Sequence, residues 1–112
     1  MMGANVHRSI GLEIRRESGP DGLVLIVSGE LDLVSAGSLE AELRQAESDG
    51  FGRVVVDLGG VEFMDSTGIH ALAVAQKRSE ANQHALSLRN PSTQVQRVLG
   101  VAGIADHFKF ES

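Results

Sequence analysis

The sequence has no cysteine, no tryptophan and no tyrosine among its 112 residues. Without cysteine the chain forms no disulfide, offers no thiolate to zinc and has no catalytic thiol, which is compatible with a reducing compartment. Aromatic residues make up only 4%, so the stacking platforms that bind single-stranded nucleic acid are not expected. The net charge of −5 also argues against direct binding of nucleic acid, which requires clustered lysine and arginine.

Long apolar segments are missing as well. The longest aliphatic run is Leu23-Val24-Leu25-Ile26-Val27, far shorter than the ~20 residues that span a bilayer. The N-terminus has no apolar stretch typical of a signal peptide. We therefore expect a cytoplasmic protein with no membrane partner. A chain of this length predicts a single domain, which we place at residues 10–112, after a flexible N-terminus over residues 1–9.

The pattern of apolar residues predicts an α/β fold. Two apolar strands flank the turn cluster Ser18-Gly19-Pro20-Asp21-Gly22 and predict an antiparallel hairpin. Helices are expected from near Ala36, from Ser66 and from Asn90-Pro91, where asparagine would be the N-cap. They alternate with strands over 54–56 and 85–89, as parallel αβ units do. We predict a mixed sheet of four to five strands with three to four helices.

The most informative segment runs from Val54 to Gly68. It reads as a buried strand, a turn at Gly59-Gly60, and a helix that begins with Asp65 as its N-cap. Ser66 then lies in the first helical turn, where backbone amides and the helix dipole favour a negative charge such as phosphate. A hydroxyl at this place can cap the helix, act as a nucleophile or accept a phosphoryl group, and the residues alone leave the three roles open.

Two acidic residues are expected at the same edge of the sheet. Glu30 and Asp32 follow the second strand of the hairpin, which should lie parallel to the strand before Ser66. The carboxyl ends of parallel strands meet at one edge, where ligands and partners of α/β sheets usually bind. We therefore expect Asp32 to be exposed beside Ser66.

The segment from Val54 to Leu72 resembles the signature of the STAS domain, and specifically that of the bacterial anti-sigma factor antagonists. The family shows Asp-Leu after a hydrophobic strand, then a hydrophobic pair, then Asp-Ser-Ser/Thr-Gly-Leu/Ile. This chain has Asp57-Leu58, Phe63-Met64 and Asp65-Ser66-Thr67-Gly68-Ile69 in that order. Three matching motifs in order are a specific signal.

Two further segments extend the resemblance. Gly29-Glu30-Leu31-Asp32 is similar to the Gly-Glu-Leu/Ile-Asp that follows the second strand in the family. A late helix that ends in a Gly-Ile step, over 95–104, also matches. The likeness therefore runs from about Leu12 to Phe110, nearly the whole chain, and implies a STAS-type single domain.

The resemblance implies a binding protein that is switched by phosphorylation, not an enzyme. In the family the serine that follows the aspartate is the phosphoacceptor, which corresponds to Ser66. The partner is an anti-sigma factor that is itself a serine kinase and supplies ATP and Mg²⁺, so the chain needs no cofactor or metal of its own. The unphosphorylated antagonist binds this kinase and frees the sigma factor. Phosphorylation ends the binding, and a phosphatase acting on phospho-Ser66 restores it.

The expected partner-binding surface consists of the residues around this serine: Glu30, Asp32, Asp65, Ser66, Thr67, Gly68 and His70. His70 departs from the family, which often has glycine or another small residue there. It lies one helical turn from Ser66, either as a solvated histidine or as a partner of a phosphate. Thr67 is a second candidate acceptor, although the family pattern favours Ser66.

Three alternative functions compete with this interpretation. A phospho-aspartate receiver-like regulator would accept phosphate on Asp57, but Glu30, Asp32 and Lys109 are poor substitutes for the acidic pair and lysine that receivers need. A serine hydrolase is disfavoured, because Ser66 lacks the Gly-x-Ser-x-Gly context and a triad. A STAS subunit of a transporter, lipid-transport or sensory complex would need no phosphorylation.

Overall fold

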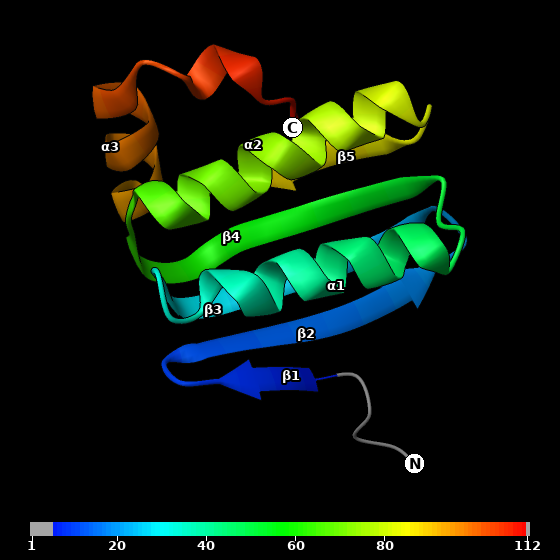
Figure 1. The fold of residues 1–112 in the computed structure, drawn as a ribbon, viewed down its shortest axis with the longest axis horizontal. Coiled ribbons are helices and arrows are strands. Elements are labelled where there is room, and N and C mark those ends of the chain that lie inside the picture. Colours follow the sequence, from blue (N-terminus) through cyan, green and yellow to red (C-terminus); the bar gives the residue numbers. More distant parts are fainter. Residues whose placement is uncertain (1–5, 112) are drawn as a thin grey trace.

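The computed structural model describes residues 6–111, which form a six-stranded mixed sheet with helices packed on it (Figure 1). The strands lie side by side in the order in which they occur along the chain. The first two pairs are antiparallel and the remaining three are parallel. The elements are β1 (Val6–Ser9), β2 (Leu12–Gly19), β3 (Gly22–Leu31), α1 (Ala36–Ser48), β4 (Arg53–Met64), α2 (Ser66–Ala81), β5 (Ala85–Arg89), α3 (Thr93–Ala102), the 3-10 turn η1 (Ala105–His107) and β6 (Phe110–Glu111). The predicted α/β class, the hairpin and the parallel units are confirmed, but the sheet has six strands instead of four to five.

The additional strand is β1. A flexible terminus was predicted over residues 1–9, of which residues 1–5 lie outside the described residues. Residues 6–9 instead pair with β2 in antiparallel register. The prediction was wrong here because four residues are too few to show an alternation of apolar and polar side chains.

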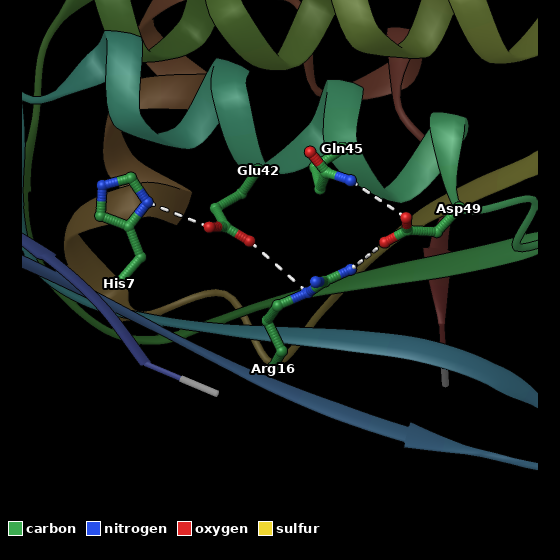
Figure 2. A network of polar contacts seen from close by, with 5 residues as sticks. All are labelled: His7, Arg16, Glu42, Gln45 and Asp49. Carbon is green, nitrogen blue, oxygen red and sulfur yellow. Dashed lines mark hydrogen bonds and ion pairs between the residues drawn. The ribbon is translucent and has the colours of Figure 1, made fainter. Parts of the chain in front are cut away.

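Polar contacts fasten this edge of the sheet to α1, as Figure 2 shows. Nδ1 of His7 in β1 lies 3.0 Å from Oε2 of Glu42 in α1. Arg16 of β2 lies 3.5 Å from the other oxygen of Glu42 and 3.0 Å from Oδ2 of Asp49. Gln45 donates to Oδ1 of Asp49 at 3.0 Å. The edge strand β1 and its neighbour β2 therefore make polar contacts with α1 and its C-cap residue Asp49, in addition to the sheet hydrogen bonds.

A single hydrophobic cluster joins the helices to the sheet. Alternate side chains of β2 to β5 are buried in it, together with one apolar side of each helix. Leu25, Val56 and Leu88 from the sheet and Leu39 from α1 have no exposed surface. Burial of this kind supplies most of the stability of such a helix, at about 25 cal/mol for each Å² of apolar surface.

β4 does not turn at Gly59-Gly60, contrary to the prediction. It continues to Met64 and pairs with β3 over most of its length, with two irregularities in register. A Cβ on Gly60 would lie 2.6 Å from Cβ of Ser28, a distance that real Cβ atoms do not adopt. Glycine is therefore needed here for the close approach of two strands, and the longer strand brings the following residues to the end of β3.

α3 begins two residues later than predicted. Its N-cap is Ser92, whose hydroxyl accepts from the amide of Val95 at 3.2 Å and donates to the carbonyl of Val61 at 2.7 Å. Asn90 has a φ of 53°, in the left-handed region that asparagine tolerates better than most residues. It ends β5 rather than capping the helix. The start of α3 is thereby fixed to β4.

Candidate functional site

Ser66 is the first residue of α2, at the carboxyl edge of the sheet. β3 and β4 run in parallel to this edge, where Leu31 pairs with Met64. The amide of Asp65 donates to the carbonyl of Leu31 at 3.2 Å. The chain therefore turns from β4 into α2 directly beside the end of β3, as predicted for the two acidic segments.

The carboxylate of Asp65 occupies the amides of the helix start. Its Oδ1 accepts from the amide of Thr67 at 2.9 Å, from the amide of Gly68 at 3.4 Å and from the hydroxyl of Thr67. The hydroxyl of Thr67, with the amides of Thr67, Gly68 and Leu33, holds the pKa of Asp65 below its usual value against a smaller effect of burial. The predicted cap is confirmed, but amides that were expected to be available to a phosphate are already bonded.

The two hydroxyls of the motif differ in environment. Thr67 is partly buried and its hydroxyl is bonded to Asp65. Ser66 is exposed, and its hydroxyl has no hydrogen-bond partner among residues 6–111. Of the two, only Ser66 presents a free hydroxyl to a second protein.

Asp32 is part of the loop between β3 and α1 rather than a freely projecting side chain. Its Oδ1 accepts from the amide of Val34 at 3.1 Å, from the amide of Ser35 at 3.2 Å and from the hydroxyl of Ser35 at 3.1 Å. Ser35 is buried and its hydroxyl also lies 2.7 Å from the carbonyl of Glu30. Asp32 is only half-buried, whereas Glu30 is exposed. The expectation that Asp32 is exposed is therefore only partly met, because its carboxylate orders this loop.

The remaining predicted residues, Gly68 and His70, lie on opposite sides of α2. Gly68 is buried, and a Cβ at this position would lie 2.8 Å from Cγ and 3.1 Å from the carbonyl oxygen of Leu31. Glycine thus lets the first turn of α2 approach β3, and it positions Ser66 without offering a surface of its own. His70 is exposed.

An apolar rim beside Ser66 was not predicted from the sequence. Leu33 and Val34, in the loop before α1, are 76% and 68% exposed, and Phe63 near the end of β4 is 44% exposed. Both segments adjoin Asp65: the amide of Leu33 contributes to its lowered pKa, and Phe63 lies two residues before it in the chain. We call Leu33, Val34 and Phe63 the apolar rim. Clustered exposed apolar side chains mark interaction surfaces, and the signal in the sequence was an aliphatic pair between a strand and a helix.

Asp57, the acceptor in the receiver alternative, is engaged in structural contacts. Its Oδ2 lies 3.1 Å from a guanidinium nitrogen of Arg89 in β5, and its Oδ1 accepts from the amide of Gly59 at 2.9 Å. The contact with Arg89 joins β4 to β5, as expected for a structural residue, although Asp57 lies within β4 and not at its end.

Residues 6–111 contain no cluster of three histidine, aspartate or glutamate side chains that would suit a metal ion. None of the helices within this range has the length and apolar character that crossing a bilayer requires.

Comparison with known proteins shows the family of this chain. The model of the STAS domain matches residues 12–112. An anti-sigma-B factor antagonist of Staphylococcus aureus is 31% identical over 80 residues, which cover 71% of this chain and 74% of that protein. The anti-sigma-F factor antagonist RsfB of Mycobacterium tuberculosis is 36% identical over 55 residues, and the match spans about half of each protein, 49% of this chain and 45% of RsfB.

The fold agrees with this result. A crystal structure of an anti-sigma factor antagonist from Mycobacterium paratuberculosis is similar with a TM-score of 0.74 and 27% sequence identity, over 90% of this chain and 86% of that one. The family model covers the hairpin, all three helices and the Asp-Ser-Thr-Gly segment. The chain therefore belongs to the STAS domain family.

Proposed function

We propose that this chain is an anti-sigma factor antagonist that binds an anti-sigma factor serine kinase, frees a sigma factor, and loses this binding when Ser66 is phosphorylated. The observation that carries the proposal is the exposed, unbonded hydroxyl of Ser66 at the start of α2. The relatives from S. aureus and M. tuberculosis are named as antagonists of anti-sigma factors, which supports a regulatory role rather than an enzymatic one. Partners of this kind act on transcription, so the proposed location is the cytoplasm.

The surface around Ser66 suits a partner that buries it. The apolar rim supplies hydrophobic contact area of the kind found in the buried core of protein interfaces. The other residues that we expect to bind the partner are Glu30, Asp32, Asp65, Thr67 and His70. Gly68 contributes by positioning Ser66.

Charge explains how a phosphate would end the binding. A phosphoserine carries about −1.5 to −2 charges near neutral pH, and Asp65 is adjacent to Ser66 and ionised at that pH because its pKa is lowered. In a complex the phosphate would be both desolvated and repelled. A few kcal/mol are sufficient, since about 1.4 kcal/mol changes an affinity tenfold, and no conformational change is required.

The test is phosphorylation and binding with candidate anti-sigma kinases. After incubation with ATP and Mg²⁺, intact-mass spectrometry with site mapping should find one phosphate, on Ser66. Ser66→Ala should bind the kinase permanently, and Ser66→Glu should bind it more weakly. Equal binding by wild type, Ser66→Ala and the phosphorylated protein would contradict the switch and favour a STAS subunit of a complex without one. A matching phosphatase should restore binding by the phosphorylated protein.

The apolar rim provides an independent prediction. Leu33→Ser and Val34→Ser should each weaken kinase binding about tenfold, as loss of an interface anchor does, and should leave the melting temperature nearly unchanged because both side chains are largely exposed. Val101→Ser is the matched control, since Val101 is 85% exposed in α3, outside the rim. Isothermal titration calorimetry of the three variants would decide, and equal affinities would refute the role of the rim.

A further inference from the structure

A phosphate on Ser66 would find few donors in the helix start. The amides of Thr67 and Gly68 donate to the carboxylate of Asp65, and the amide of Ile69 donates to its carbonyl at 3.2 Å. A phosphate at a helix N-terminus usually binds such amides. Here a carboxylate that belongs to the fold already occupies them, so a side chain must provide any counter-charge.

The geometry of α2 supplies one candidate. Residues four apart on a helix differ by about 40° in direction and lie on one face, one turn apart. His70 is in this relation to Ser66, and both residues are exposed. Lys77 points in a direction similar to that of Ser66 but lies about 16 Å from Ser66 along the helix axis, which is too far for a contact.

Other charged groups surround this face of the helix. Asp65 precedes it, and Asp32 lies in the loop beside it. On the neighbouring helix α1, Glu40 is paired with Arg44 at 3.5 Å. On the far side, Asp106 and His107 of η1 line a depression with Lys77, beyond His70. None of the acidic groups can hold a phosphate, and the nearest basic side chain along the helix is His70.

We propose that His70 is the positioning residue for phosphorylated Ser66, and that its protonated imidazole pairs with the phosphate across one turn of α2. The inference rests on the proposed function for the presence of a phosphate there. A hydrogen bond between a cationic donor and a phosphate is stronger than one between neutral groups, so a cationic side chain one turn away would offset part of the charge of a phosphate that the helix amides do not bind.

The experiment uses the full chain with phosphoserine installed at position 66 during translation, which makes it independent of any kinase. The ³¹P resonance is followed from pH 4.5 to 9 at low salt in the wild type and in His70→Gln, His70→Lys and His107→Gln. A cation about 6 Å from the phosphate in water, with salt screening, should lower the midpoint of the phosphate titration by about 0.3 to 0.5 pH unit. His70→Gln should remove this shift, and His70→Lys should retain it.

His107→Gln is the matched control, because it removes an exposed histidine that lies beyond the reach of Ser66, and its midpoint should equal that of the wild type. Equal midpoints for wild type and His70→Gln would overturn the proposal, and so would an equal change in His107→Gln. Failure of the proposed function has a different signature. Phosphoserine at position 66 would then leave kinase binding unchanged, whatever the ³¹P titration shows.

Discussion

Replacing Asp65 by alanine should destabilise the fold by about 2 kcal/mol at pH 7. An N-cap aspartate is worth about 0.5 to 2 kcal/mol relative to alanine. Asp65 should lie at the upper end of this range, because its carboxylate binds the hydroxyl of Thr67 in addition to the amides of Thr67 and Gly68. Without it, the first turn of α2 would lose this acceptor.

The effect should depend on pH in a defined direction. Since the pKa of Asp65 is lowered in the folded state, its ionised form stabilises the protein. This contribution is fully present above about pH 4, the ordinary value for aspartate, and is lost as the pH falls through the lower folded-state value. The difference between wild type and Asp65→Ala should therefore shrink below pH 4. Asp49, whose pKa is lowered chiefly by its hydrogen bond with Arg16, titrates in the same window but is present in both proteins.

Urea denaturation at pH 7 and at pH 3 measures both effects. With a slope of about 2 kcal/mol per molar urea, a loss of about 2 kcal/mol moves the midpoint by roughly 1 M. Ser92→Ala is the matched control, because it removes the N-cap of α3 through a group that does not titrate, and its loss should be similar at both pH values. A loss below about 0.5 kcal/mol at pH 7, or an equal loss at both pH values, would refute the reasoning for Asp65.

Two further variants test how the site is built. Gly68→Ala should lower the free energy of unfolding by about 1 to 3 kcal/mol, because its Cβ would meet the side chain and carbonyl oxygen of Leu31. Gly100→Ala, with open space around it, should instead stabilise α3 by about 0.5 to 1 kcal/mol. Thermal denaturation measures both, and equal effects would contradict the packing argument. Asp32→Ala should lower the free energy of unfolding by about 1 kcal/mol, since it removes the acceptor for Ser35. An unchanged melting temperature together with weaker kinase binding would show that Asp32 acts in partner binding and not in ordering the loop.

The parts of the fold that were predicted correctly depend on local signals. The hairpin follows from a turn cluster between two apolar strands, and α1 ends at Asp49 and Gly50, where glycine has a φ of 82°. Asp65 caps α2 as expected. In each case the preferred conformation is decided by residues within one or two turns of each other, and neighbouring elements reinforce it.

The parts that were missed depend on contacts between distant segments. Glycines in sequence indicate either a turn or a close approach, and only the position of Ser28 shows that Gly60 is of the second kind. Asn-Pro is a common helix start, but the hydroxyl of Ser92 bonds to Val61 in another element, 31 residues away, and this contact places the helix start later. β1 is too short to show a pattern of its own; it pairs with β2, and His7 also contacts Glu42, 35 residues along the chain.

By itself the sequence determined the fold class, the family resemblance and the position of Ser66 at a helix start, because these depend on periodicity and on one contiguous motif. Only the tertiary structure decided which groups at that site are already hydrogen-bonded and which are exposed. It showed that Asp65 occupies the amides of the helix start, that Asp32 orders its own loop, and that Leu33 and Val34 are exposed beside the serine. The physical reason is that the sequence predicts that the ends of β3 and β4 meet at this edge, but not which donors and acceptors pair there or which side chains remain exposed.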